Sequence, residues 1–443
     1  MIEKIKYYKG RGGMKTKAKR EMQSHFTGEL IQQDPLLGDI LNREKTRQAT
    51  QVELIASENI VSRAVLEALG DTITNKTVEG YPGARYHAGA GILDEAERAA
   101  IERATQLFRC QYANVQPHSG SQANQAVFVA LLKPGDTVMS MALSAGGHLS
   151  HGAAPNMSGK WFNAIQYDVE PETGLLDYAQ LEQLALEHKP KLIIAGGSAY
   201  PRVIDFEFIR SVADRVDATF LVDMAHFAGL VAGEAHPSPI PHAHIVSCTT
   251  TKTLRGPRGG LLLTNDEVLA KKLNSAIFPG MQGSLHPNTI AAKAVCLGEA
   301  LRPSFKDYAK QVVVNARALA SALETRGVGI CTGGTDTHLI LIDLKTKGLL
   351  GVQAEPLLES ANITCNKNSI PSDLNSPKKW TGLRLGTAAG TTRGMDAEIF
   401  TQIGNLIADL LDSASETGEA NLAVIENVKK SVLEICKKHP TYP

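Results

Sequence analysis

Short apolar runs alternate with helical stretches between about residues 90 and 300 of this 443-residue chain. Leu192–Ala195 and Phe220–Val222 are two such runs. The segment between them has apolar residues at the i, i+3, i+4 and i+7 positions of one helix face, namely Ile209, Val212, Ala213 and Val216. This alternation predicts an α/β fold with a mainly parallel sheet covered by helices. In such sheets ligands bind at the carboxyl ends of the strands.

Three residues with useful chemistry, Ser198, Asp223 and Lys252, come just after apolar strand-like runs. We therefore expect them at one edge of one sheet. Lys252 follows the apolar run Ala243–Val246 and precedes a loop rich in glycine, proline and arginine. Because burying an unpaired charge is costly, a lysine at such a place tends to be neutral. A neutral amine can form a Schiff base with an aldehyde.

Length and composition limit the classes of function. The chain exceeds the usual size of one core, so at least two domains are expected. The chain has 46 lysines and arginines and 46 aspartates and glutamates. It therefore lacks the excess of positive charge that nucleic-acid binding proteins show. No apolar run reaches eighteen residues and no secretory signal is recognisable, so no membrane partner is expected. The scattered cysteines predict reduced thiols and a cytoplasmic location.

The residue composition and pattern change along the chain and predict where its segments begin and end. Its first residues are strongly basic and predict a flexible extension, with an organelle transit peptide as the alternative. After residue 300 the strand candidates Thr337–Leu344 and Gly382–Gly386 indicate a smaller α+β domain. We predict four segments: a basic extension (1–26), an N-terminal arm (27–60), a large domain (61–301) and a small C-terminal domain (302–443).

Three further features each allow two interpretations. Ser119–Asn124 precedes a helical run, where free backbone N–H groups can bind phosphate or where a serine can simply cap the helix. Asp223 can pair with a cationic ring nitrogen, or it can be a helix cap or an ion-pair partner. Arg384 lies in an apolar strand pattern, where it needs an anion such as a bound carboxylate or a structural salt bridge.

His148 and His151 have a spacing that could suit a metal on a helix. The glycines around them indicate a loop, and the sequence offers no cysteine or carboxylate nearby to complete a site. We therefore predict no metal.

The remaining features fit one ligand. A phosphate cradle, an aspartate for a pyridinium nitrogen and a lysine for an aldehyde are what pyridoxal 5′-phosphate needs. An arginine for an α-carboxylate makes the substrate an amino acid.

With these features together, the chain resembles the serine hydroxymethyltransferases, which are fold-type I pyridoxal-phosphate enzymes, from about residue 27 to the C-terminus. The motifs that carry the resemblance are Leu54–Asn59 (LIASEN), Glu79–Gly83 (EGYPG), Asn114–Asn124 (NVQPHSGSQAN), Gly197–Tyr200 (GSAY), Asp223–His226 (DMAH) and Lys252–Arg258 (KTLRGPR). The resemblance implies an aspartate-aminotransferase-like fold, with a seven-stranded, mainly parallel sheet in the large domain and a smaller α+β domain.

The resemblance also implies residue roles. Lys252 would carry the cofactor, Asp223 would pair with its pyridine nitrogen, and His148 would stack on its ring. The implied catalytic residues are Lys252, Glu79, His148 and Thr249. The other implied cofactor contacts are Ser119, Gly120, Ser121, Ser198, His226, Gly280 and Gly283. The implied substrate contacts are Ser57, Thr77, Glu79, Tyr86, His87, Thr251 and Arg384. The implied contacts to tetrahydrofolate, the cosubstrate, are Glu79, Tyr86, Leu143, Gly147, Leu149 and Asn368.

Part of this implied site comes from a second subunit. In the family, Glu79, Tyr86 and the Gly280–Gly283 loop reach into the partner's site. The resemblance therefore implies a homodimer, with a tetramer as the alternative.

Three residues depart from the usual family pattern. Thr77 and His87 replace tyrosines, and Thr251 replaces the histidine before the lysine. A threonine at position 77 leaves room for an α-methyl group on the substrate. Burying one methyl is worth about 0.8 kcal/mol, and forcing one into a packed site costs about 1–3 kcal/mol. The combination resembles the branch of the family that acts on α-methylserine.

The chemistry of that substrate is restricted. α-Methylserine has no α-hydrogen, so only retro-aldol loss of its hydroxymethyl group or decarboxylation remains. After retro-aldol cleavage, protonation gives D-alanine in that branch of the family. The expected function is interconversion of α-methylserine and D-alanine, with the one-carbon unit passed to or from tetrahydrofolate. The alternatives are an ordinary serine/glycine hydroxymethyltransferase, a folate-independent α-methylserine aldolase, and a non-catalytic regulatory or RNA-binding homologue.

Overall fold

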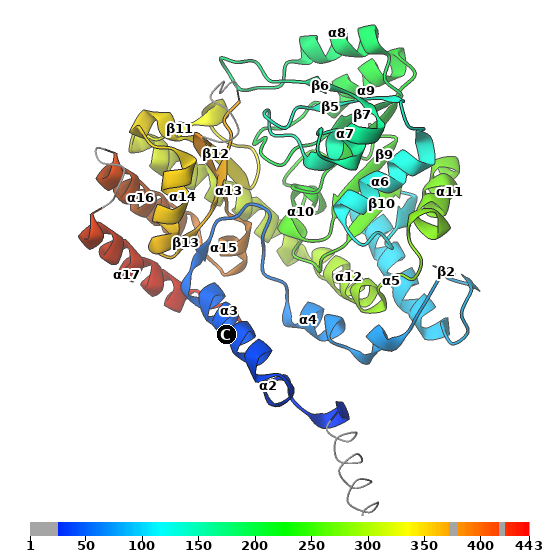
Figure 1. Ribbon diagram of the computed structural model, residues 1–443, viewed down its shortest axis with the longest axis horizontal. Coiled ribbons are helices and arrows are strands. Elements are labelled where there is room, and N and C mark those ends of the chain that lie inside the picture. Colours follow the sequence, from blue (N-terminus) through cyan, green and yellow to red (C-terminus); the bar gives the residue numbers. More distant parts are fainter. Residues whose placement is uncertain (1–24, 372–379, 416–420, 443) are drawn as a thin grey trace, which may run out of the picture. The chain divides into compact units, whose positions relative to one another are not determined.

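The structure is a computed structural model that describes residues 25–371, 380–415 and 421–442 (Figure 1). The chain forms two compact units, Met1–Thr50 and Gln51–Pro443. The basic segment 1–24 lies outside the described residues, so its flexibility stays a prediction, as do the four predicted segment boundaries. Within the described ranges, no helix combines the length and the apolar character that a membrane span needs.

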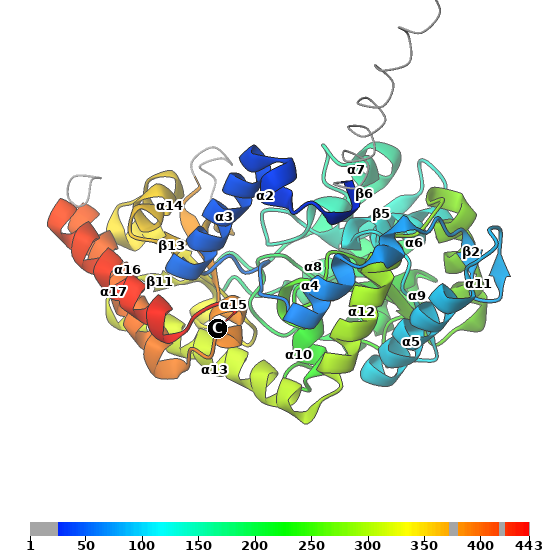
Figure 2. The same cartoon turned by 90° about the horizontal axis from the view of Figure 1, so that it is seen from below.

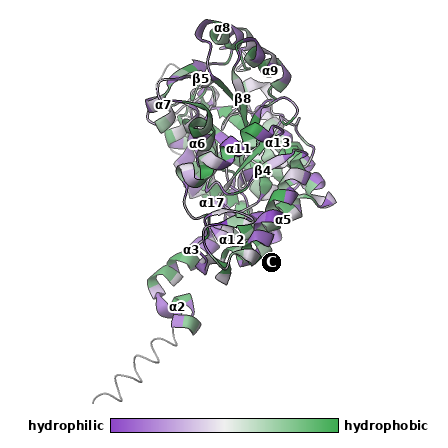
Figure 3. Ribbon diagram, turned by 90° about the vertical axis from the view of Figure 1, so that its right-hand side faces the viewer, coloured by the Kyte–Doolittle hydropathy of each residue, from purple (hydrophilic) through white to green (hydrophobic). Residues whose placement is uncertain are grey.

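The described part of the first unit contains the helices α2 (Leu30–Gln33) and α3 (Pro35–Thr50). Proline suits the first position of α3 because its missing N–H has no partner there. Hydrophobic and hydrophilic residues alternate along these helices in Figure 3. The large apolar side chains of α3 are exposed, namely Leu36, Leu37, Ile40 and Leu41.

The second unit is built on a seven-stranded sheet (Figure 1). Its strand order is β4 (Tyr112–Asn114), β10 (Gly260–Thr264), β9 (Ile245–Thr249), β8 (Thr219–Asp223), β7 (Leu192–Ala195), β5 (Thr137–Met141) and β6 (Asn163–Tyr167). The strands from β9 to β6 pair in parallel, and β10 pairs antiparallel with β9 and β4. The predicted mainly parallel sheet is confirmed.

Both faces of this sheet are buried, because alternate residues of each strand enter different cores. Ile193 and Ala195 belong to one apolar cluster, whereas Leu192 and Ile194 belong to another. The covering helices include α5 (Gly91–Phe108), α6 (Gly120–Leu131), α8 (Tyr178–His188), α9 (Phe206–Arg215), α11 (Glu267–Ser275) and α12 (Pro287–Ala300). Figure 2 shows α12 beside α5 and α4 (Arg63–Leu69). The helix predicted between β7 and β8 is confirmed as α9, and Val216 caps its end.

A four-stranded antiparallel sheet follows later in the chain. Its order is β11 (Gly329–Ile330), β12 (Leu339–Asp343), β15 (Gly382–Gly386) and β14 (Asn366–Asn368). This sheet shares an apolar core with the helices α13 (Pro303–Thr325), α14 (Gly351–Ser360), α16 (Ala397–Ala414) and α17 (Leu422–Lys438). The two strands predicted in this region are confirmed as β12 and β15.

The predicted sharing of one sheet edge is also confirmed. β7 and β8 are parallel neighbours, as are β8 and β9, so their carboxyl ends meet. Asp223 ends β8, and Ser198 and Lys252 follow β7 and β9 by three residues each. The predicted strand Ala243–Val246 was placed too early, because the strand runs from Ile245 to Thr249. It includes the polar residues Ser247 and Thr249, which pair with the neighbouring strands.

Candidate active site

A cavity of about 180 Å³ lies at the carboxyl edge of the large sheet. Most of the residues predicted to hold a cofactor line it: Ser119, Gly120, Ser121, His148, Ser198, Asp223, His226 and Lys252. Thr249, predicted as catalytic, and Thr251, predicted as a substrate contact, line it too. His151 and Arg258 also line it. The sequence prediction therefore brought the right residues together, although their roles stay predictions.

Lys252 begins a 3₁₀ turn, Lys252–Leu254, directly after the β9 loop. Its backbone has a positive φ of 56°, and its carbonyl accepts a hydrogen bond from Asn59 Nδ2 at 2.7 Å. Burial lowers the pKa of its amine to about 8, while Asp223 acts in the opposite direction and Arg384 in the same direction. Near neutral pH a useful fraction of Lys252 is therefore the neutral nucleophile.

Asp223 is buried at the end of β8 with three donors. Its Oδ2 accepts from Asn124 Nδ2 at 2.8 Å and from His151 Nε2 at 2.9 Å, and its Oδ1 accepts from the N–H of Ala225 at 3.0 Å. Burial opposes its ionisation, but the hydrogen bond and charge of His151 and further contacts hold the pKa of Asp223 well below its usual range. The result is a fixed negative charge in the cavity.

The sequence analysis missed Asn124 as a partner of Asp223. Asn124 lies on the buried face of α6, and its Oδ1 accepts from Ser247 Oγ at 2.6 Å. A polar residue in an otherwise apolar helical run was the available signal, because a buried amide requires partners.

His148 and His151 lie on one loop, as their glycine neighbours predicted. Burial lowers the pKa of His148 to about 4, so its ring is neutral, and its Nδ1 accepts from the N–H of Ser150 at 3.2 Å. The expectation that no carboxylate completes this pair was wrong. Potential ligand atoms of His148, His151 and Asp223 lie within 4.8 Å of one another, because the fold brings β8 beside the loop.

The predicted phosphate cradle lies at the N-terminus of α6. Ser119 caps this helix by accepting from the N–H of Gln122 at 3.1 Å, and Gly120 and Ser121 form its first turn. The helix begins six residues before the predicted apolar run. The cap interpretation of Ser119 is therefore confirmed, and phosphate binding by the first turn, whose residues line the cavity, stays a prediction.

Arg384, on β15, lies beside this cavity. Its Nη1 donates to the Ser198 carbonyl at 2.6 Å and its Nε donates to Asn366 Oδ1 at 3.2 Å. Burial lowers its pKa to about 10. Among the described residues no carboxylate oxygen lies within the 4.0 Å ion-pair distance of Arg384, which disfavours a structural salt bridge and leaves its charge for a ligand anion.

Two buried histidines contact each other at the cavity, of which His226 lines it. His226 Nδ1 lies 3.3 Å from His338 Nε2, and their rings stack with centroids 5.5 Å apart. Burial, followed by the charges of Lys252 and Arg384, holds the pKa of His226 far below its usual value. The sequence analysis missed His338, whose place in an apolar strand start was its only signal.

The structure does not bring the residues expected from a second subunit into this cavity. Tyr86, expected from the partner, is 75% exposed. Thr77 and His87, which were predicted as substrate contacts, are also exposed and do not line the cavity. Glu79 lies near Gly283, since a Cβ on that glycine would be 3.2 Å from Glu79 Oε1. Of the predicted folate contacts, Leu143 and Leu149 are about half exposed, Gly147 is buried and Asn368 is on β14. The predicted cofactor contact Gly280 is exposed, and the predicted substrate contact Ser57 is half-buried.

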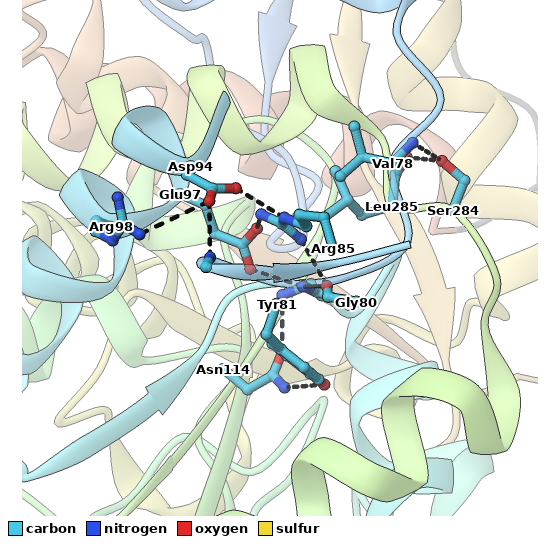
Figure 4. A network of polar contacts seen from close by, with 12 residues as sticks. Val78, Gly80, Tyr81, Arg85, Asp94, Glu97, Arg98, Asn114, Ser284 and Leu285 are labelled. Atoms are coloured by element: carbon cyan, nitrogen blue, oxygen red, sulfur yellow. Dashed lines mark hydrogen bonds and ion pairs between the residues drawn. The ribbon is translucent and has the colours of Figure 1, made fainter. Parts of the chain in front are cut away.

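A buried polar network fixes the hairpin of β2 (Gly80–Tyr81) and β3 (Ala84–Arg85), next to Glu79 and Tyr86 (Figure 4). Arg85 forms ion pairs with Asp94 at 2.8 Å and with Glu97. Glu97 also accepts from Gln116 Nε2 at 2.7 Å. Because these side chains are paired and largely buried, the exposed residues on the hairpin are held in a defined position.

The chain is similar to known hydroxymethyltransferases along most of its length. The family model described as "Serine hydroxymethyltransferase" matches residues 30–407. A "2-methylserine hydroxymethyltransferase" from an Ensifer species is 60% identical over 95% of this chain and 98% of its own length. One from an Aminobacter species is 59% identical over 95% and 99%. A "Serine hydroxymethyltransferase" from Zymomonas mobilis is 59% identical over 96% and 99%. The site and the comparisons together show that the chain belongs to the serine hydroxymethyltransferase family.

Proposed function

We propose that this protein is a hydroxymethyltransferase that interconverts α-methylserine and D-alanine and exchanges the one-carbon unit with tetrahydrofolate. Relatives of nearly equal identity are named for 2-methylserine and for serine, so overall similarity does not choose between these substrates. The observation that carries the proposal is Thr251, a small side chain that lines the cavity beside Lys252. Its Oγ1 lies 3.0 Å from Thr249 Oγ1.

The residues of the cavity fit pyridoxal 5′-phosphate, a cofactor used by the family in general. The N-terminus of α6 offers N–H groups to a phosphate, Asp223 offers a fixed negative charge to a ring nitrogen, and Lys252 offers an amine of lowered pKa. The cofactor supplies an electron sink for the substrate bond that breaks.

The chain's own groups select and hold the amino acid. The guanidinium of Arg384 is buried and available for the α-carboxylate. His148 is neutral and lines the cavity, and the ionised Asp223 carboxylate would hold a proton on a ring nitrogen of the bound cofactor. A substrate with a methyl group in place of the α-hydrogen reacts only by loss of its hydroxymethyl or carboxyl group. Threonines at positions 77 and 251, where the family usually has a tyrosine and a histidine, leave space for that methyl.

We also propose a homodimer with shared active sites, with a tetramer as the alternative. Glu79 and Tyr86, the residues expected from the partner, do not line the cavity of their own chain, and the network around Arg85 holds the hairpin between them in place. The exposed apolar side chains of α3 offer further surface for a second copy. A cytoplasmic location is consistent with six free cysteines.

The test is cleavage of α-methylserine and of L-serine by the purified holoenzyme, each with and without tetrahydrofolate. The proposal expects α-methylserine to be the better substrate and its cleavage to need tetrahydrofolate. Faster cleavage of serine would support the second candidate, an ordinary serine hydroxymethyltransferase, which the Zymomonas relative's name favours. Full-rate release of formaldehyde from α-methylserine without folate would identify an aldolase.

A further inference from the structure

Lys293 is a second buried lysine, and nothing in the proposed reaction uses it. It lies on α12 and only 1% of its surface is exposed. Its Nζ donates to three backbone carbonyls: Val115 at 2.6 Å, Pro117 at 2.9 Å and Gly260 at 2.9 Å. An ammonium group has three N–H donors and no acceptor, so every donor of Lys293 has a partner.

The three carbonyls belong to two segments that adjoin residues lining the cavity. Val115 and Pro117 lie in the loop that leads from β4 to Ser119, the cap of α6. Gly260 begins β10, and its register partner on β9 is Thr249. The N–H of Gly260 also donates to the Pro117 carbonyl at 2.9 Å, so the two segments are joined directly and through Lys293.

The residues around this lysine are packed so tightly that neither Gly259 nor Gly260 has room for a side chain. A Cβ on Gly259 would lie 2.1 Å from Lys293 Cε, and a Cβ on Gly260 would lie 2.4 Å from the Ser119 carbonyl oxygen. The Gly259 carbonyl in turn accepts from Thr249 Oγ1 at 2.8 Å. A shift of Lys293 would therefore reach both the helix cap and the loop that leads to Lys252.

We propose that Lys293 is a positioning residue that fixes the phosphate cradle at Ser119–Ser121 against β10 before the cofactor binds. The ligand that this cradle would bind is a phosphorylated aldehyde cofactor, so the inference rests on the function proposed above. Lys293 acts through the backbone of residues 115–119 and does not touch the ligand.

The charge state of Lys293 agrees with this role. Burial lowers its pKa to about 7, while Cys248 and Glu97 act in the opposite direction. The three carbonyl oxygens match the ammonium form, because a neutral amine has two donors and would leave one carbonyl facing a lone pair. The nearby His118 is held neutral at physiological pH, since burial, His286 and Lys293 lower its pKa to about 4.

The test compares the affinity of the apoprotein for pyridoxal 5′-phosphate and for pyridoxal, which lacks the phosphate. Lys293→Met keeps an unbranched apolar side chain that matches the lysine stem as far as Cε and removes the donors of Nζ. We expect this variant to bind pyridoxal phosphate at least about tenfold more weakly and pyridoxal within about twofold of the parent. An unchanged ratio of the two affinities would overturn the inference.

Arg393 provides the matched control. It is also a buried cation that donates to backbone carbonyls, those of His439 at 2.7 Å and Gln51 at 2.7 Å, away from the cavity. Arg393→Met is expected to lower the melting temperature while it keeps the parent's ratio of affinities. Equal loss of that ratio in both variants would show general destabilisation and would reject a specific role for Lys293.

A second measurement does not depend on the variants folding. In the parent apoprotein, hydrogen exchange at the N–H groups of Gln122 and Gly260 should be nearly as slow as with pyridoxal phosphate bound, because both already donate to the segment that Lys293 fixes, to Ser119 Oγ and to the Pro117 carbonyl. Fast exchange that slows only with the cofactor would contradict the inference. A parent that does not bind pyridoxal phosphate at all would instead reject the proposed function.

Discussion

His151 donates a hydrogen bond from Nε2 to Oδ2 of Asp223 at 2.9 Å, and both side chains are buried. This contact, with that of Asn124, keeps a carboxylate ionised in a cavity where burial alone would protonate it. Loss of His151 should therefore change the pKa of Asp223.

Substitution His151→Gln should raise the pKa of Asp223, because the largest opposing interaction is weakened. A group with a lowered pKa is ionised above that pKa, so raising it moves the acid limb of the activity profile to higher pH. We expect kcat to fall by about tenfold at neutral pH with little change in KM. The measurement is the pH dependence of kcat, with the half-exposed His188→Gln as control. An acid limb at the parent's pH would argue that His151 does not act through Asp223.

The lowered pKa of Lys252 predicts when the cofactor attaches. Burial brings this pKa to about 8, so the reactive neutral amine forms as the pH rises through 8 and is complete above it. Stopped-flow mixing of apoprotein with pyridoxal phosphate should give an attachment rate that rises with pH to a plateau, with its midpoint near 8. Lys252→Ala should show no borohydride-stable attachment. A midpoint near the ordinary lysine value would mean that the amine is not buried in the apoprotein.

Arg384→Lys should weaken substrate binding more than cofactor binding. A lysine keeps the charge but loses the planar pair of donors that suits a carboxylate. We expect KM for the amino acid to rise by roughly a hundredfold, since hydrogen bonds to charged groups contribute about 1.5–3 kcal/mol. Affinity for pyridoxal phosphate should stay within about twofold. A parallel loss of both affinities would show that Arg384 supports the cavity as a whole through Ser198 and Asn366.

Shared active sites predict complementation between two inactive variants. Lys252→Ala disables the cavity, and Glu79→Gln disables the residue expected from the partner. Co-refolded or co-expressed subunits form mixed dimers in which one site has both native residues, so up to about a quarter of the parent activity should return. Mixtures that stay inactive, with mixed dimers verified by tagged purification, would place Glu79 in its own chain's site or outside the reaction.

The sequence predicted the parts of the fold whose signals are local. The apolar runs around Ile193 and Phe220 had to be buried strands, and the face of Ile209 and Val212 had to be a helix, because few other arrangements bury those residues. Ser119, Asp223 and Lys252 followed from their places after strands and before a helix. Thr77 has no such local signal, and its predicted contact with the substrate came only from the family resemblance.

The missed residues act through contacts between distant segments. Asn124 and His151 meet Asp223 across 99 and 72 positions of the chain, and Lys293 reaches Val115 across 178. No periodic pattern records such a pairing, because each residue looks like an ordinary polar side chain on its own element. The wrong start of β9 has a similar cause: Ser247 and Thr249 look like loop residues until the neighbouring strands β8 and β10 supply their hydrogen-bond partners.

The size of the space around the α-carbon is the central claim, and acceptor preference tests it most directly. With methylenetetrahydrofolate, kcat/KM is measured for D-alanine and for glycine in the parent and in the double variant Thr77→Tyr, Thr251→His. The account predicts that the parent prefers D-alanine by about tenfold to a hundredfold and that the double variant reverses this preference. A parent that prefers glycine would contradict the account.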